Sequence, residues 1–200
     1  DLTFGEGGHS GALLRHGASQ VWAVDRDSSA IALYQKEGPF RDDPRLKLFQ
    51  GCYSSFPDTA SGQLFDGILV DLGVSTRQLL EAGRGFSIKE AGPLDMRMDQ
   101  SEGETLQDLL ERVDEEELAD LLYHNADLHQ SRSISRKIHR AFKEGRLKTT
   151  HDLAALFPGP AHRSSPATPI FMALRMAVNR ELQEIETTLP RLIPLLKVGG

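Results

Sequence analysis

The opening 27 residues, DLTFGEGGHSGALLRHGASQVWAVDRD, constrain the fold more than any other stretch of the chain. Gly5, Gly7 and Gly8 supply turn positions that can adopt positive φ and let a backbone come close to a ligand. A helix over residues 10–15 and a short apolar strand over residues 21–24 are expected to follow. A strand end, glycine turn, helix and second strand in this order predict an α/β fold with a nucleotide-like ligand at the turn.

Asp25 closes the second predicted strand, eighteen positions after Gly7. This interval suits the acid that hydrogen-bonds a ribose hydroxyl at the tip of that strand in a nucleotide-binding unit. We expect Leu13 and Leu14 of the intervening helix to turn inward and Gly17 to end the helix.

Two ligand classes fit this unit. A dinucleotide fingerprint GxGxxG would need a third glycine at position 10, where the chain has Ser10. The acids Asp1, Glu6 and Asp25 suit the sulfonium cation of S-adenosylmethionine better than a pyrophosphate. His9 is placed to hydrogen-bond such a cofactor. The sequence favours the methyl donor, with a dinucleotide and a structural turn without a ligand as alternatives.

Size and composition set limits on the fold. The chain has 200 residues, 39% hydrophobic and 26% charged, as in one soluble domain with an insertion. Its apolar runs fall short of the ~18 residues of a membrane span, so we expect no membrane segment and a cytoplasmic location. Cys52 stands alone, and the spacing of histidines and acids predicts no metal site. Because the chain starts inside a motif and stops at a turn, we expect its sheet to be incomplete.

The next elements continue an α/β pattern. A helix over 28–37 capped by Ser28, a third strand over 46–50 and a fourth strand over 65–71 (FDGILVD) are predicted. The unbroken apolar run of the fourth strand is typical of a strand covered on both faces. Because ligands lie beyond the carboxyl ends of such strands, Asp71 is expected at the rim of the site, with a capping or turn-forming role as the alternative. Tyr53, after the third strand, is predicted beside an adenine ring or in simple packing.

Residues 83–99, GRGFSIKEAGPLDMRMD, crowd charged and apolar side chains among glycines. The alternation over 94–99 fits a half-buried strand. Its place directly after the predicted fourth strand favours instead a loop that contacts substrate.

Helical periodicity fills residues 105–157, with Asp114 and Glu117 as a capping box and Thr150 as a helix cap. A Pro/Ser-rich connection over 158–169 leads to a single long helix over 169–188, and Pro190 is expected to start a last short helix. Residues 131–150 carry seven basic side chains against one acid, although the net charge of the chain is −6. This basic segment predicts either a surface that contacts phosphates or an ordinary solvated face.

The chain resembles the ribosomal RNA small subunit methyltransferase H family. The resemblance rests on motifs that run from end to end of the chain: DLTFGEGGHS (1–10), VDRD (24–27), DGILVDLGVSTRQL (66–79), RGFS (84–87), GPLDMRMD (92–99) and SPATPIFMALRMAVNRELQEIE (165–186). It implies S-adenosylmethionine-dependent methylation of the exocyclic N4 of a cytosine in small-subunit ribosomal RNA. It also implies RNA binding, a role in rRNA processing, and either the rRNA or the small ribosomal subunit as partner; a homodimer stays open.

The resemblance also suggests residue roles. Cofactor contacts carry over to the glycine turn, to Asp25 and Asp71, and to Gln78, with Tyr53 where the family usually has Phe. The complete cofactor set is Gly5, Gly7, Gly8, His9, Asp25, Tyr53, Asp71 and Gln78. We expect Asp71 or Asp95 to accept the N4 proton and Arg97 to hold the base or a phosphate. The expected substrate contacts are Arg84, Phe86, Asp99, Arg136, Arg140 and Lys143.

The expected architecture is a Rossmann-like class I methyltransferase sheet with an all-helical insertion between the fourth and fifth strands. Residues 1–100 would form the cofactor-binding core, 101–165 the insertion that recognises RNA, and 166–200 the return to the core. Three alternatives remain: an NAD-dependent oxidoreductase, a non-catalytic RNA-binding or ribosome assembly factor, and a methyltransferase acting on another RNA or on DNA amines.

Overall fold

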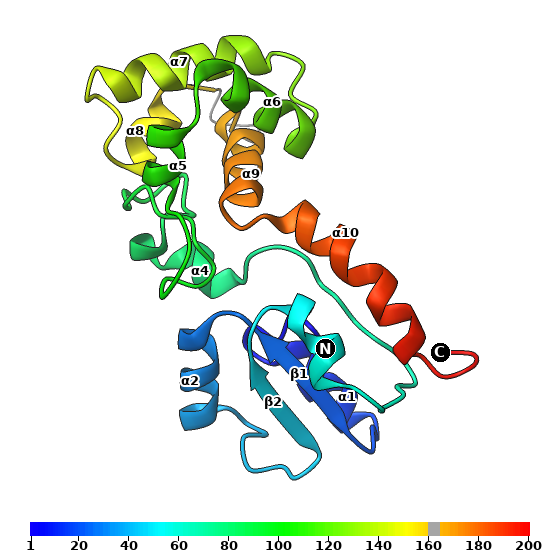
Figure 1. The fold of residues 1–200 in the computed structure, drawn as a ribbon. Coiled ribbons are helices and arrows are strands. Elements are labelled where there is room, and N and C mark those ends of the chain that lie inside the picture. Colours follow the sequence, from blue (N-terminus) through cyan, green and yellow to red (C-terminus); the bar gives the residue numbers. More distant parts are fainter. Residues whose placement is uncertain (160–164) are drawn as a thin grey trace. The chain divides into compact units, whose positions relative to one another are not determined.

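The computed structural model of the protein describes residues 1–159 and 165–200. The middle of the predicted Pro/Ser-rich connection, residues 160–164, lies outside the described residues. The chain divides into two compact units, each described by itself (Figure 1). The sheet unit comprises Asp1–Ser75 and Gln183–Gly200, and the helical unit comprises Thr76–Leu182.

The helices and strands are, in chain order, α1 (Gly8–Arg15), β1 (Val21–Asp25), α2 (Ser28–Glu37), β2 (Leu46–Gln50), η1 (Tyr53–Ser55), α3 (Phe56–Thr59), α4 (Thr76–Leu80), η2 (Ala82–Arg84), α5 (Leu106–Arg112), α6 (Glu115–Ala126), α7 (Ser131–Lys143), α8 (Thr150–Ala155), α9 (Ala167–Val178), α10 (Glu181–Leu192) and η3 (Ile193–Leu195). Among the described residues, no helix is both long and apolar enough to cross a membrane. The chain is therefore a mixed α/β protein with a short parallel sheet.

The sheet unit is built on β1 and β2, which pair in parallel from Val21 with Leu46 to Asp25 with Gln50. The opening residues lie along the other edge of β1. The backbone nitrogen of Phe4 donates to the carbonyl of Val24, and the nitrogen of Val24 donates to the carbonyl of Asp1, both at 2.9 Å. The predicted strands over 21–24 and 46–50 are confirmed, and the chain enters the glycine turn beside β1.

The predicted continuous strand over 65–71 is wrong. Phe65 makes a single parallel bridge with Leu196, while the carbonyl of Leu69 accepts from the nitrogen of Leu2 at 2.9 Å. The segment thus bonds to one neighbour at its start and to another near its end. Neither edge carries a continuous ladder, which explains why the apolar run forms extended backbone without a regular strand.

Successive residues of β1 contribute to two separate apolar clusters, as expected for extended backbone. Leu2 and Val24 are buried with Phe56, and Trp22 packs against the same cluster. Phe4, Ala23 and Tyr34 form the second cluster. The rings of Phe4 and Tyr34 meet edge to face at 4.6 Å between centroids, directly below the glycine turn.

Helix α1 differs in detail from its prediction. It begins at Gly8 rather than at residue 10, and of the two leucines expected to turn inward only Leu14 is buried. Leu13 is 42% exposed. Leu14 shares the inward face with Ser10 and Gly11, four and three residues before it, whereas the next position back, Leu13, is rotated by about 100° from Leu14 toward solvent.

Two caps lie one residue before the predicted ones. Asp27, rather than Ser28, caps α2 and accepts from the nitrogens of Ser29 and Ala30. Thr149, rather than Thr150, caps α8. In both cases the capping side chain precedes the first helical residue, where its oxygen reaches the free amides of the first turn. The capping box that starts α6 at Asp114 is confirmed.

The single long helix predicted over 169–188 is two helices. α9 ends at Val178 and α10 begins at Glu181, with Arg180 between them in the left-handed region at φ 51°. A left-handed residue ends a helix. Pro190 lies inside α10 and does not start a further helix.

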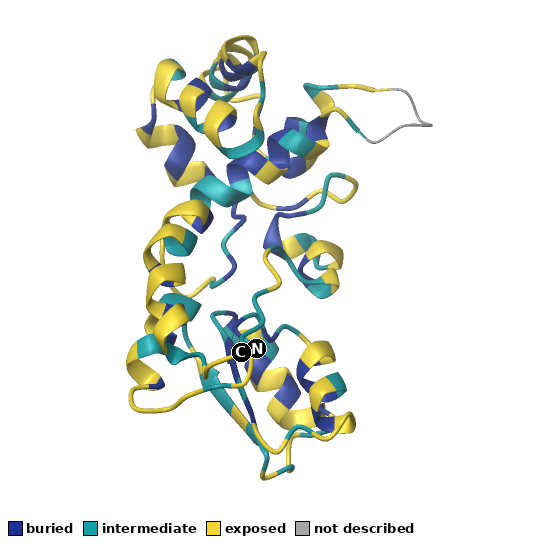
Figure 2. Cartoon of the chain, turned by 90° about the vertical axis from the view of Figure 1, so that its right-hand side faces the viewer, coloured by how far each residue is buried: buried dark blue, intermediate teal, exposed yellow. Residues whose placement is uncertain are grey.

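The helical unit packs α6 against both α7 and α9. The helices bury one face and expose the other, which is visible in the alternating blue and yellow of the ribbons (Figure 2). Leu118, Leu122, Ile138 and Leu174 are fully buried at this junction. Residues 105–157, all of them described, consist of helices and the turns between them, as the periodicity predicts.

Candidate active site

The glycine turn has a shape that only glycine allows at position 7. Gly5 and Gly7 have φ of 54° and 77°, the left-handed region that side-chain-bearing residues rarely adopt. A Cβ on Gly7 would lie 2.6 Å from the ring of Tyr34 and 2.9 Å from that of Phe4. Gly8 is already helical and has open space around it.

Asp25 braces the glycine turn from the end of β1. One of its carboxylate oxygens accepts from the nitrogen of Gly5 at 2.6 Å, and the other accepts from the nitrogen of Asp27 at 2.8 Å. Burial raises the pKa of Asp25 above its ordinary value, although these two backbone bonds act in the opposite direction. The predicted ribose contact of Asp25 stays a prediction, because in this structure both of its oxygens accept from backbone.

Asp71 lies at the same edge as the glycine turn. Its carboxylate is 3.2 Å from Nε2 of His9, and its backbone nitrogen donates to Oγ1 of Thr3 at 2.7 Å. The side chains of His9 and Asp71 are 53% and 70% exposed. Ser75 is close enough that a Cβ on Gly5 would touch it. The topology thus gathers the glycine turn and the Asp71 segment and leaves one carboxylate open to solvent.

Tyr53 and Gln78, two further predicted cofactor residues, are placed differently. Tyr53 lies in η1 and packs its half-buried side chain against the cluster around Leu2. Gln78 is 7% exposed in α4 of the helical unit. Beside Tyr53, the thiol of Cys52 donates to Glu184 at 3.1 Å, and burial raises the pKa of this thiol. The cofactor contacts of Tyr53 and Gln78 stay predictions.

The segment 83–99 is a tightly folded loop in the helical unit. Gly85 has φ 74°, and a Cβ on Gly92 would overlap the carbonyl of Ala82 more closely than real Cβ contacts allow. The nitrogen of Gly92 donates to Oγ1 of Thr150 at 3.0 Å, and the nitrogen of Thr150 donates back to Gly92 at 2.9 Å. The half-buried strand that alternation also allowed over 94–99 does not form.

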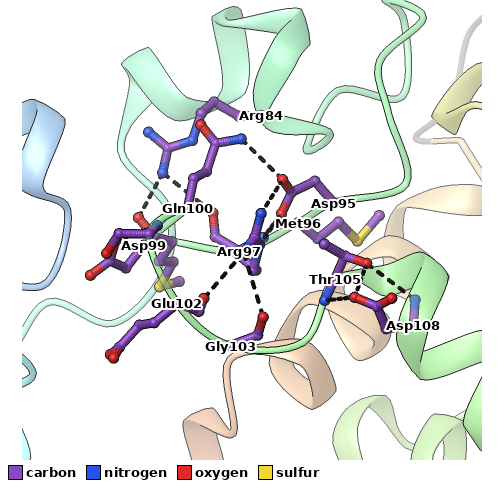
Figure 3. A network of polar contacts seen from close by, with 12 residues as sticks. Arg84, Asp95, Met96, Arg97, Asp99, Gln100, Glu102, Gly103, Thr105 and Asp108 are labelled. Atoms are coloured by element: carbon purple, nitrogen blue, oxygen red, sulfur yellow. Dashed lines mark hydrogen bonds and ion pairs between the residues drawn. The ribbon is translucent and has the colours of Figure 1, made fainter.

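Asp95 and Arg97 form a two-pronged ion pair at the centre of this loop (Figure 3). Nε and a terminal nitrogen of Arg97 donate to the two carboxylate oxygens at 2.8 and 3.0 Å, and Nε2 of Gln100 adds a bond at 3.1 Å. Burial alone raises the pKa of Asp95, but these hydrogen bonds outweigh it and the pKa lies below its ordinary value. Asp95 is therefore an ionised carboxylate whose lone pairs are engaged.

The other predicted substrate residues of the loop support it from within. Arg84 is 5% exposed and donates to the carbonyls of Met98 at 2.6 Å and Arg97 at 3.3 Å (Figure 3). Phe86 is 5% exposed, and Asp99 accepts from the nitrogen and hydroxyl of Ser101. Their contact with substrate stays a prediction.

Asn179 is a residue of this region that the sequence reasoning missed. It lies just after α9, is 6% exposed, and reaches the backbone of Met96 and Met98. Met96 has φ 62° and is fully buried. A left-handed residue with a side chain costs roughly 1–2 kcal/mol. The pattern of 169–188 offered one signal, an asparagine at the middle of a predicted helix, where that residue is a poor helix former.

The three predicted RNA-binding residues lie on or near the exposed face of α7. Arg136 pairs with Glu115 at 3.2 Å and Arg140 with Glu144 at 2.8 Å. Lys143 is exposed at the end of the helix. Such exposed pairs contribute only about 0–1 kcal/mol, so a phosphate can replace the acid as partner. Among the described residues, no group of acids, histidines and cysteines is arranged to hold a metal ion.

Comparison with known proteins matches residues 1–200 to the model of the MraW methylase family. The chain belongs to this family.

Among the curated relatives of this MraW methylase family chain are three proteins named ribosomal RNA small subunit methyltransferase H, which confirms the resemblance predicted from the motifs. The protein of Cereibacter sphaeroides is 43% identical, that of Sorangium cellulosum 39% and that of Hydrogenovibrio crunogenus 40%, each over all of this chain. The chain spans 61% of the length of the first and 66% of the other two.

Proposed function

We propose that this member of the MraW methylase family transfers a methyl group from S-adenosylmethionine to the N4 amine of a cytosine in small-subunit ribosomal RNA. Its relatives' name supports the substrate class, and the open carboxylate of Asp71 beside the glycine turn is the observation in this structure that supports the chemistry. The partner would be the rRNA or the small ribosomal subunit, and the location cytoplasmic.

The residues at this edge suit a cationic methyl donor. The turn 5–9 and the segment 71–75 contain Glu6, His9 and Asp71 but no lysine or arginine, so the acids at this edge suit a sulfonium cation better than a pyrophosphate. The pairing of 1–4 with β1 and of Leu2 with Leu69 supports a Rossmann-like class I sheet. Residues 1–100 would form its core, 101–165 a helical insertion and 166–200 the return to the core, whereas compactness groups all of Thr76–Leu182 in the helical unit.

The reaction needs a nitrogen made more nucleophilic. When bound, S-adenosylmethionine supplies a methyl carbon on a sulfonium, and transfer forms the N4–C bond as the C–S bond breaks and its electron pair stays on sulfur. A carboxylate that accepts the N4–H localises the nitrogen lone pair and takes the proton. Such help is worth about 10²–10⁴-fold in rate.

Of the two acids predicted for this role, we assign it to Asp71. Its oxygens face solvent and are shared only weakly with the exposed side chain of His9. The oxygens of Asp95 are occupied by Arg97 and Gln100, and the pKa of Asp95 is lowered, which makes it a poor base. Asp95 would instead fix Arg97, whose guanidinium would orient the base or a phosphate.

The test compares Asp71→Asn with Asp66→Asn. Asp66 is an exposed carboxylate of the same extended segment and pairs with Lys197, so it controls for loss of a surface charge. With radiolabelled S-adenosylmethionine and undermodified small subunits, Asp71→Asn is expected to lower kcat by about 10²-fold or more, whereas Asp66→Asn leaves it unchanged. Full turnover of Asp71→Asn would refute the assignment, and no label on N4-methylcytidine with the unmodified protein would refute the function.

The α7 residues Arg136, Arg140 and Lys143 are proposed to contact RNA phosphates. Reversing all three to Glu should weaken RNA binding and flatten its salt dependence by about two units of slope, since each phosphate contact contributes ~0.7 on single strands. The control reverses Lys36, Arg41 and Lys47, three exposed residues of the sheet unit. It makes the same change in charge on another surface. Equal RNA affinity of the two triple variants would return α7 to an ordinary solvated face.

A further inference from the structure

The loop that carries Asp95 and Arg97 adopts a conformation that its own sequence does not favour. Met96 separates the two charged residues and is left-handed at φ 62°, although it is neither glycine nor asparagine. Its side chain is fully buried, so the conformation is held from the surroundings. Since the backbone at Met96 sets the directions in which its two neighbours leave the chain, whatever holds Met96 also aims the ion pair.

The side chain of Asn179 makes contacts on both sides of that position. Its amide nitrogen donates to the carbonyl of Met96 at 2.7 Å, and its amide oxygen accepts from the nitrogen of Met98 at 2.8 Å. A single planar group thus fixes the peptide after Met96 and the amide two residues on. These bonds join residues 81 and 83 positions apart in the sequence.

Asn179 is itself held in place at the end of α9. Its amide nitrogen also donates to the carbonyl of Arg175 at 2.8 Å. The side chain of Arg175 forms a two-pronged ion pair with Glu181 at 2.7 and 2.9 Å, and these side chains are 17% and 9% exposed. This pair spans the left-handed Arg180 and ties the end of α9, which presents Asn179, to the start of α10.

We propose that Asn179 is a positioning residue for methyl transfer, which holds Met96 left-handed and thereby fixes the ion pair of Arg97 and Asp95 in the geometry needed for contact with substrate. The third nitrogen of the Arg97 guanidinium donates to the carbonyls of Glu102 and Gly103 within the same loop. The catalytic consequence rests on the function proposed above, whereas the structural part does not. Asn179 touches neither reacting group itself: its polar atoms are engaged with backbone and it is almost fully buried.

Two substitutions distinguish the hydrogen bonds that Asn179 makes with Met96 and Met98. Asn179→Ala removes both of its contacts with the loop. Asn179→Asp keeps an oxygen that accepts from the nitrogen of Met98, but places a second oxygen against the carbonyls of Met96 and Arg175. The matched control is Asn125→Ala, because Asn125 also ties a side-chain amide to a backbone carbonyl, that of Ala173 at 3.0 Å, within the same unit and away from the loop.

The first measurement is amide hydrogen exchange by NMR, which needs no activity. Exchange at Met98 should rise about 10-fold or more in Asn179→Ala, and stay near that of the unmodified protein in Asn179→Asp and Asn125→Ala. If exchange at Met98 is unchanged in folded Asn179→Ala, Asn179 does not hold the backbone at Met96 and Met98. This outcome would overturn the structural part of the proposal whether or not the protein is a methyltransferase.

The second measurement is the kinetics of methyl transfer. In Asn179→Asp, kcat should fall about 10²-fold, the loss that a displacement of order 1 Å causes, while affinity for S-adenosylmethionine changes less than about 3-fold. Asn125→Ala should keep the kcat of the unmodified protein when all proteins are assayed at one temperature at which both variants are folded. Equal kcat in the two variants would show that Asn179 acts only on stability and would overturn the positioning role.

Discussion

Two glycine-rich loops of this protein differ in how their charged side chains are used. The turn 5–9 of the sheet unit is braced by the carboxylate of Asp25, which accepts from the nitrogen of Gly5, and the exposed side chains of His9 and Asp71 lie beside it. The loop 83–99 of the helical unit buries Arg84 and Asp95 and pairs Asp95 with Arg97. The first loop thus keeps ionisable groups available to a ligand, while the second uses them to keep its own shape.

The difference indicates which acids can do chemistry. A carboxylate that is exposed and weakly partnered can take a proton from a substrate, and one with a two-pronged arginine cannot do so without losing its support. This contrast supports the proposed reactive role of Asp71 and an architectural role for Asp95. Substitutions in the helical-unit loop should accordingly cost more stability than those at the open edge.

The largest effect is expected from Gly92→Ala. The added methyl would overlap the carbonyl of Ala82, and backbone atoms on both sides leave it no room to move. We expect a loss of about 4 kcal/mol in the free energy of unfolding, above the ~1–3 kcal/mol usual for overpacking. Gly83→Ala is the control, because a Cβ there meets open space. Chemical denaturation measures both, and similar values would contradict the tight packing of the loop.

A somewhat smaller loss, about 3 kcal/mol, is expected for Gly7→Ala. The strain of a left-handed alanine adds roughly 1–2 kcal/mol to the displacement of the Tyr34 and Phe4 rings, which can shift in part. Gly8→Ala should leave stability unchanged or slightly raised, because Gly8 is helical and unobstructed. Isothermal titration of Gly8→Ala with S-adenosylmethionine then tests its proposed cofactor contact without a folding defect. A Gly8→Ala protein as unstable as Gly7→Ala would argue against this geometry.

Asp95→Asn should destabilise the protein by about 2 kcal/mol. Breaking a fully buried pair typically costs 3–5 kcal/mol, and this pair retains 11% and 20% side-chain exposure. Thermal unfolding measures the loss of stability in Asp95→Asn and in the control Asp99→Asn. The carboxylate of Asp99 accepts from the nitrogen and hydroxyl of the nearby Ser101. Equal losses would mean that the Arg97 pair adds nothing to the loop.

The carboxylates of Asp95 and Asp25 should make the free energy of unfolding depend on pH in opposite directions. The pKa of Asp95 is lowered, so below about pH 3.8 the unfolded chain binds this proton first and stability falls as the pH falls. The pKa of Asp25 is raised, so above 3.8 the folded protein keeps this proton longer and stability falls as the pH rises. Denaturation between pH 2 and 6 should show that Asp95→Asn removes the first slope and Asp25→Asn the second. Parallel curves for the two variants would contradict the assignment.

The smallest effect on stability is expected for His9→Ala. The His9–Asp71 pair is exposed, and such pairs contribute little, so the melting temperature should stay within about 2 °C. Affinity for S-adenosylmethionine should nevertheless fall about 3- to 10-fold, the worth of one hydrogen bond. A large thermal shift without a change in affinity would place His9 with the architectural residues.

Local patterns predicted the structure well in both units where short-range chemistry decides it. The apolar runs of β1 and β2, the left-handed glycines at positions 5 and 7, and the capping box at Asp114 all depend on neighbours within a few residues. The membership of the MraW methylase family followed from motifs that combine such local signals over the whole chain.

Predictions failed where distant segments decide. The run 65–71 has the composition of a buried strand, but its partners, Leu2 and Leu196, come from opposite ends of the chain and prevent a regular ladder. Periodicity could not show the break between α9 and α10, because it depends on Asn179 turning toward a loop 80 residues earlier. Asp71 and Asp95 read alike in sequence, and only their contacts distinguish them.

The dependence of the loop 83–99 on later residues has a consequence for how the chain matures. Gly92 is hydrogen-bonded to Thr150, and Met96 and Met98 are hydrogen-bonded to Asn179. These partners lie 58 to 83 positions further along the chain. During synthesis from the N-terminus, the loop therefore has no lasting form until the end of α9 has left the ribosome. The segment expected to meet ribosomal RNA thus takes its final form only after residues up to 83 positions further along have been synthesised.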